Sequence, residues 1–269
     1  RDIGVTGVQT CALPIYPWTG VSSEPQGLFS RIARRIRRVR SFDSRPMSSD
    51  SILEESAHSF DAITSLDETV WACSLPSLHD IISTGDGNTP VIHHLLLAEA
   101  YMFANLYQLY YIFPSLRRRR AKYIIEATNS HSSKKPSWAE SQVRLWIPIL
   151  QQFEGTEKWL RFLGHSIIVR LEQIQESSRT SCVQALLLLV AAGSLWSCPD
   201  WEGSEAEGEL VEARQFVLNR LSFISESNLS PPVEHVRTVV LEIFKRLDVG
   251  VDVFWMDVLQ SMGVLTIIG

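Results

Sequence analysis

The chain has 269 residues, with 25 lysines and arginines against 30 aspartates and glutamates, which gives a formal net charge of −5. This mildly acidic balance excludes a surface devoted to nucleic acid over the whole chain, although it permits a local basic patch. The length suffices for one sizeable hydrophobic core, or for a domain with a linker arm.

The first 15 residues, RDIGVTGVQTCALPI, follow neither helical nor strand periodicity. Polar residues and glycines interrupt every apolar run that a signal peptide would need. Residues 5–15 resemble the conceptual translation of a sequencing-adapter oligonucleotide, whose upstream part also encodes Arg1 and Asp2. We therefore expect residues 1–15 to be a non-native, adapter-derived segment, and the true start of the protein to lie outside this chain.

Outside that segment the chain has three cysteines, Cys73, Cys182 and Cys198. Because their number is odd and their spacing wide, they predict neither a disulfide framework nor a metal site. Sparse cysteines of this kind fit a reducing compartment, the cytosol or the nucleus.

Residues 16–51 are expected to form a turn, a basic helix and a linker. The stretch PWTGVSSEPQG (17–27) has the prolines, glycines and serines of turns. In LFSRIARRIRRVR (28–40), Leu28, Ile32, Ile36 and Val39 recur at helical spacing. Arginines fill the other positions of this amphipathic helix: Arg31, Arg34, Arg35, Arg37, Arg38 and Arg40. The serine-rich stretch 41–51 predicts a linker.

Residues 52–269 predict an all-helical domain. The run 91–113 is apolar almost all round, so we expect a central helix that Pro114 ends, followed by a short helix over LRRRRAKYII. Polar breaks are expected at 129–137 and 197–209, with helical segments at 138–147 and 158–176 between them. A second apolar run covers residues 182–196. Neither run is expected to span a membrane, because run 91–113 carries several polar residues and run 182–196 is too short.

Two helices close the chain. An apolar stripe begins at Leu210, and a second helix has Ser230 and Pro231 at its start and Gly250 just past its end. Alternating strand patterns are essentially absent. The sequence thus predicts the all-α class: an array of roughly eight to ten helices forming one domain, with the N-terminal basic helix and linker attached.

The arginine-rich helix is the most visible candidate site. Its basic side could serve nuclear import, contact the DNA backbone or lie on a membrane surface. Equally, the helix could pack its apolar side on the domain and leave the arginines solvated or paired with acids. For the second basic run, Arg117 to Arg120, we expect a solvated helix face.

No pattern predicts catalysis or metal binding. His93 and His94 are adjacent, so they diverge on a helix, and neither has a second ligand four residues away. Gly193 and Ser194 lack the flanking pattern of a nucleophile elbow, and no phosphate-binding glycine loop or dinucleotide fingerprint occurs. We expect no enzyme, no catalytic or metal-ligating residue and no cofactor in this chain.

Four stretches, taken in their order along the chain, carry a resemblance to a known family: PWTGVSSEPQGLFSRIARRIRRVRS, SSRTSCVQALLLLVAAGSLW, EARQFVLNRLSFISE and VVLEIFKRLDVGVDVFWMDVLQSMG. They resemble the C-terminal regulatory region of fungal zinc-cluster transcription factors, the fungal-specific transcription factor domain. The resemblance covers most of the chain from Pro17 to Gly269 and is loose over residues 41–90.

The resemblance implies a nuclear regulator of transcription by RNA polymerase II. In that family a six-cysteine cluster with two zinc ions reads DNA, and the helical domain modulates activity through co-regulators, a small-metabolite effector or homodimerisation. This chain has no C-x-x-C spacing, so zinc is expected only in a cluster outside it. The alternative is an all-α protein-interaction scaffold without a DNA-linked role.

Overall fold

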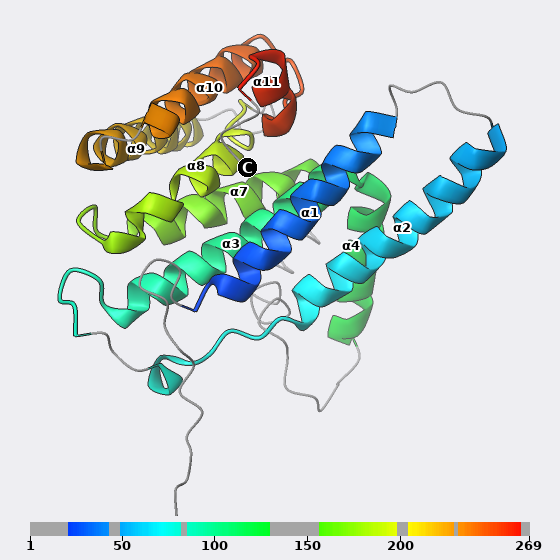
Figure 1. Cartoon of the computed structure of the whole chain (residues 1–269), viewed down its shortest axis with the longest axis horizontal. Coiled ribbons are helices and arrows are strands. Elements are labelled where there is room, and N and C mark those ends of the chain that lie inside the picture. The colour runs from blue at the N-terminus through cyan, green and yellow to red at the C-terminus, as the bar shows by residue number, and fades with distance from the viewer. Residues whose placement is uncertain are drawn as a thin grey trace, which may run out of the picture.

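The computed structural model describes residues 21–42, 49–81, 85–129, 156–197, 204–228 and 231–264. Within these ranges the chain forms nine α-helices and two short 3₁₀ helices, with no strand (Figure 1). The predicted all-α class is therefore confirmed. Segment 1–15, the predicted helix at 138–147 and all but the first residue of the predicted break at 129–137 lie outside the described residues.

The helices follow one another in a simple order. The first four are α1 (Ser23–Phe42), α2 (Ser49–Ala72), α3 (Val91–Ile112) and α4 (Pro114–Asn129), with the 3₁₀ helix η1 (Leu78–Asp80) before α3. The others are α7 (Thr156–Glu172), η2 (Arg179–Val183), α8 (Ala185–Ala192), α9 (Ser204–Asn228), α10 (Pro231–Asp248) and α11 (Trp255–Ser261).

Helix α3 is the central element, as its apolar composition predicts. Nearly every side chain from His93 to Tyr110 is buried. It packs most extensively against α7 on one side and α1 on another, and it also contacts α2, α4 and α8. Helices α9, α10 and α11 pack beside α8 at one end of the array (Figure 1). A helix that is apolar all round needs neighbours all round, and the array supplies them.

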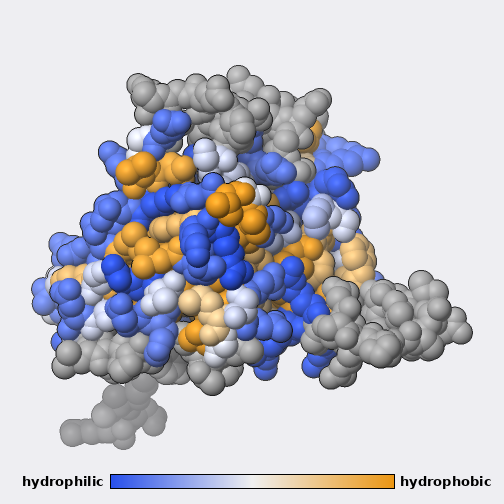
Figure 2. All heavy atoms as spheres, turned by 90° about the horizontal axis from the view of Figure 1, so that it is seen from above, coloured by the Kyte–Doolittle hydropathy of each residue, from blue (hydrophilic) through white to orange (hydrophobic). Residues whose placement is uncertain are grey.

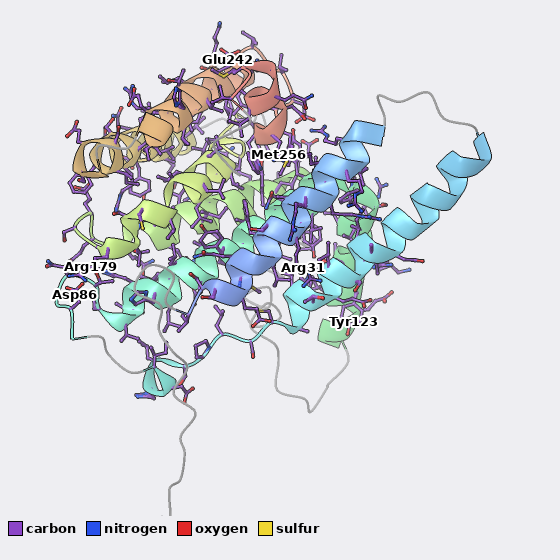
Figure 3. The ribbon with its side chains drawn as sticks, viewed as in Figure 1. Arg31, Asp86, Tyr123, Arg179, Glu242 and Met256 are labelled. Atoms are coloured by element: carbon purple, nitrogen blue, oxygen red, sulfur yellow. The ribbon has the colours of Figure 1, made fainter. Side chains whose placement is uncertain are left out.

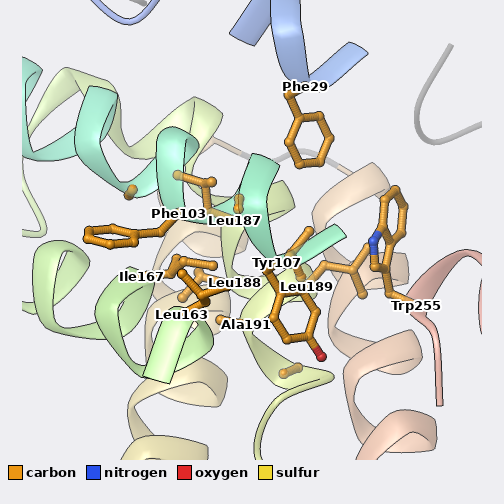
Figure 4. Packing of buried hydrophobic residues seen from close by; sticks show 14 of the residues in the cluster. Phe29, Phe103, Tyr107, Leu163, Ile167, Leu187, Leu188, Leu189, Ala191 and Trp255 are labelled. Carbon is orange, nitrogen blue, oxygen red and sulfur yellow. The ribbon is translucent and has the colours of Figure 1, made fainter. Parts of the chain in front are cut away.

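One continuous core joins these helices (Figure 4). Phe29 of α1 packs edge-on against Tyr101 with ring centroids 5.8 Å apart, and stacks on Trp255 of α11 at 6.3 Å. The N-terminal basic helix is therefore part of the core.

Helices α7 and α8 approach each other closely at Gly164. A Cβ added to Gly164 would stand 1.8 Å from Ser194 Oγ, so only glycine permits this close approach.

The apolar residues that repeat at helical spacing in α7, α9 and α10 form stripes on one side of each helix. The stripe of α7 and the turn after it is buried, and so are those of α9 and α10, except for half-buried Leu210. Gly250 has φ 75° just past the end of α10, where Val251 N–H donates to the Arg246 carbonyl at 3.0 Å. This is the left-handed helix end that the glycine predicts.

Three helices begin at least three residues before their predicted positions. Helix α1 begins at Ser23 rather than at residue 28, because Pro25 sits in the first turn, where no N–H is needed, and Gln26 donates to Ser22 Oγ at 2.7 Å. Helix α2 begins at Ser49, so the expected boundary between residues 51 and 52 falls inside it. Helix α9 begins at Ser204, inside the predicted break 197–209, where Ser-Glu-Ala-Glu has the pattern of a capping box.

Candidate functional site

Helix α1 separates its residues into an apolar side and a basic side. Residues three and four apart lie on one side of a helix, and the buried members of α1 follow that spacing. They are Pro25, Leu28, Phe29, Ile32, Ala33 and Ile36. Because these side chains are fixed in the core, the orientation of the opposite side of α1 is fixed as well.

Four of the six candidate arginines form the exposed side of α1. Arg31, Arg34, Arg37 and Arg38 are exposed, and we call them the arginine face. Figure 3 labels Arg31 on α1, which crosses the front of the molecule. Among the described residues, no carboxylate pairs with Arg31, Arg34 or Arg37, and Arg34 Nε donates only to the Ser30 carbonyl at 3.3 Å.

The other two candidates play different parts. Arg40 forms an ion pair with Asp257 of α11, and its Cζ lies 5.2 Å from the centroid of the Phe254 ring. Arg35 is half-buried. The six arginines therefore do not form one patch, since Arg40 attaches α1 to the C-terminal segment while the arginine face points to solvent.

The C-terminal segment contacts α3 as well as α1. The Phe254 ring stacks on Tyr111 of α3 at 5.3 Å, and Tyr111 Oη donates to Asp252. Burial and this hydrogen bond both raise the pKa of Tyr111. Phe254 and Trp255 lie in one of the stretches that carry the family resemblance, and no local pattern connects them with α1, more than 200 residues earlier in the chain.

The second basic run contradicts the prediction of a solvated face. Arg118 and Arg119 are exposed, but Arg117 is buried and Arg120 is largely buried. Arg120 Nε donates to Asp67 Oδ2 at 3.0 Å, and Asp67 Oδ1 accepts from Tyr110 Oη at 2.8 Å. The Asp67 side chain is fully buried. A buried carboxylate needs a partner, and α4 turns an arginine inward to supply it.

This network extends to the aromatic residues around it. Trp71 Nε1 donates to Tyr110 Oη at 2.7 Å, and the Arg120 Cζ lies 4.8 Å from the centroid of the Trp71 ring. Burial raises the pKa of the Asp67 carboxyl, while the charge of Arg120 opposes that rise. The network joins α2, α3 and α4, so we assign it a structural role.

Two polar residues inside α3 form hydrogen bonds with neighbouring helices. Asn105 Nδ2 donates to the Pro25 carbonyl at the start of α1 at 3.0 Å, and Glu99 accepts from Arg170 Nε of α7 at 3.0 Å. Gln108 is fully buried, and neither end of its amide has a hydrogen-bond partner among the described residues. The sequence shows these polar residues within an apolar run, but not which helices they face.

His93 and His94 are buried at the start of α3, and neither Nδ1 has a hydrogen-bond partner among the described residues. Burial lowers the pKa of both, and the neighbouring charge of Asp86 works against this for His94. Asp86 itself pairs with Arg179 at 3.1 Å (Figure 3). In the part of the chain that the structure describes, no group of three His, Cys, Asp or Glu side chains could hold a metal ion.

The Gly193-Ser194 pair has a packing role. Ser194 Oγ donates to the Ala191 carbonyl at 2.7 Å, at the end of α8. A Cβ on Gly193 would stand 3.3 Å from Tyr107 Oη. Both residues thus serve close contacts at the end of α8.

None of the described helices is both long and apolar enough to span a bilayer. Seen from above, hydrophobic residues emerge between hydrophilic ones across the middle of the face (Figure 2). The exposed large apolar residues are scattered over several elements, among them Val211, Leu241 and Val249.

Comparison with protein families gives one result. The family model described as the fungal specific transcription factor domain matches residues 7–268. It describes a transcription factor domain and not an enzyme family. No curated protein and no solved structure matches the chain significantly. The match includes residues 7–15 of the segment expected to be adapter-derived, and the origin of that segment stays a prediction.

Proposed function

Because the chain belongs to the fungal specific transcription factor domain family, we propose that it is the regulatory domain of a nuclear factor that controls transcription by RNA polymerase II. The observation that carries this proposal is the family match, which extends over nearly the whole chain. A role in transcription regulation follows from the family. The polymerase, the zinc cluster and the partners are the finer parts of the proposal.

The arrangement of the helices supports a regulatory role. Helix α3 contacts α1, α2, α4, α7 and α8, so a co-regulator or metabolite that displaces α3 would affect most of the array. Packed cores respond to such displacements by switching between discrete arrangements. We propose that co-regulators, a small-metabolite effector or a second copy of the chain act through this core.

DNA reading is assigned to another part of the same protein. The 269 residues contain no C-x-x-C spacing, whereas a two-zinc cluster of this family has six cysteines. We propose that such a cluster precedes residue 16 in the full-length protein and holds the zinc. Sequencing the complete transcript tests this: a six-cysteine cluster in frame upstream is expected, and a continuous reading frame without one would refute direct DNA binding through a cluster.

A reporter experiment tests the regulatory role. The chain is fused to an unrelated DNA-binding domain and expressed in a fungal strain with that domain's operator before a reporter gene. A change in reporter output relative to the DNA-binding domain alone is expected. A matched control carries Leu188→Asp, which places a charge in the α8 core and should abolish the effect. Unchanged output with the intact fusion would favour the scaffold alternative.

A further inference from the structure

The arginine face of α1 concentrates positive charge on one side of a helix in an acidic chain. Arg31, Arg34 and Arg37 are exposed and form no ion pair with the described residues, in a chain whose net charge is −5. These three guanidinium groups face solvent. We propose that the arginine face binds the phosphate backbone of duplex DNA.

The spacing of the arginines fits this ligand. From Arg31 to Arg37 the helix rises about 9 Å, at about 1.5 Å per residue. A DNA strand carries one phosphate for about every 3.4 Å of helix axis, so the face spans two to three phosphates. Guanidinium groups bind phosphate through two parallel hydrogen bonds, and the basic side of α1 consists of arginines without a lysine.

The rigidity of α1 also favours a structured polyanion. The core side chains Phe29 and Ile32, and the Arg40–Asp257 ion pair, hold the helix in place. The backbone of α1 therefore loses little conformational freedom when the arginine face binds a ligand. A receptor that reads an extended basic segment, as in nuclear import, would first have to pull this helix out of the core.

Three other partners fit less well. Over residues 21–40, no large apolar side chain is exposed, so α1 offers nothing to insert into a membrane. An acidic, amphipathic protein segment would find no apolar contact on the same face. Single-stranded nucleic acid stacks on aromatic side chains, and α1 exposes none over this range. The arginine face offers positive charge without apolar or aromatic contacts, and protein contacts to the backbone of a DNA duplex are mainly of this charged kind.

This inference rests on the proposed function only for the presence of DNA near the domain. Binding to phosphates carries no sequence information, so it would add affinity and orientation to a DNA reader elsewhere in the protein. Measuring the purified chain on DNA of arbitrary sequence therefore tests the inference separately from the reporter and transcript experiments.

Fluorescence anisotropy of the full chain with a labelled 20-base-pair duplex provides the test. With three phosphate contacts, the affinity should fall about 40-fold between 50 and 200 mM salt. The variant Arg31→Gln/Arg34→Gln/Arg37→Gln should lose most of the binding and of its salt dependence, with the slope reduced by about one per arginine replaced. The charge-conserving variant Arg31→Lys/Arg34→Lys/Arg37→Lys should keep most of both.

A matched control separates a local face from the overall charge. Arg118, Lys122 and Lys245 are also exposed and lie on α4 and α10. Their triple glutamine variant changes the net charge by the same amount and should bind DNA as the unchanged chain does. The circular dichroism and melting temperature of every variant should match the unchanged chain, because all six positions are exposed.

Other outcomes overturn the proposal. Equal losses in the two glutamine variants would show a diffuse charge effect. No binding to the duplex at 50 mM salt, together with binding to poly-glutamate or to phosphatidylserine vesicles, would assign the face to a protein or a membrane instead. Unchanged duplex binding in the α1 variant would place the DNA contact elsewhere.

Discussion

The two arginine runs have similar composition but opposite structural roles. In α1, Arg31, Arg34, Arg37 and Arg38 are exposed opposite a buried apolar side, and Arg40 forms an ion pair with Asp257 of α11. In α4 the first and last arginines of the run turn inward, and Arg120 neutralises the buried carboxylate of Asp67. A run of like charge thus has no structural role of its own, because the elements packed around it decide which side chains are buried.

Removing Arg120 should have the largest effect. The Arg120→Ala variant leaves Asp67 buried without its charged partner, which should lower the free energy of unfolding by about 3–5 kcal/mol. Arg34→Ala, the same change on the exposed face of α1, should alter it by no more than about 0.5 kcal/mol. Urea unfolding of both variants measures the difference. Equal effects would contradict the contrast between the two runs.

His93 and His94 are buried titratable groups, and unlike Arg120 neither forms an ion pair with a described carboxylate. Because burial lowers the folded-state pKa of His93 and His94, the unfolded chain takes up protons first as the pH falls below about 6.5. Stability should therefore decrease from that pH down to the lower folded-state pKa values. Asp86 near His94 and Arg220 near His93 are the charged neighbours.

Urea midpoints measured between pH 7.5 and 5 test this prediction. The variant His93→Gln/His94→Gln should flatten the decrease, and His165→Gln should leave it unchanged because His165 is exposed on α7. If the double variant loses stability as steeply as the unchanged chain over this range, the histidines do not cause the decrease.

The Arg40–Asp257 pair should have the smallest effect on stability. Its side chains are 38% and 47% exposed, so Arg40→Gln should cost about 0.2–1 kcal/mol. Arg37→Gln, three residues earlier and without an ion pair among the described residues, is the control. Urea unfolding measures both variants. A loss above this range would show that the contact between α1 and α11 carries more stability than one solvated ion pair.

Local patterns predict α1 better than α4 for a physical reason. In α1, Leu28, Ile32 and Ile36 repeat at helical spacing, so the positions of the arginines follow from the sequence alone. In α4 four consecutive arginines point around the whole helix. Which of them is buried depends on Asp67, 53 residues before Arg120, and no local spacing carries that information.

The same difference applies to the candidate site as a whole. The central position of α3 and the ends of α10 follow from apolar periodicity, Pro231 and Gly250. The ion pair between α1 and the C-terminal segment joins Arg40 to Asp257, 217 residues apart, and could not be predicted from helix periodicity. The sequence does not predict the start of α1, because a first turn that contains a proline has the composition of a loop.

The central claim is that Arg31, Arg34 and Arg37 of α1 face outward while the ends of the α4 run face inward. Modification of the native chain with phenylglyoxal, followed by peptide mass spectrometry, measures the reactivity of every arginine in one experiment. Arg31, Arg34 and Arg37 should react quickly, and Arg117 and Arg120 should react only after unfolding. Equal rates for the two runs in the native chain would contradict the account.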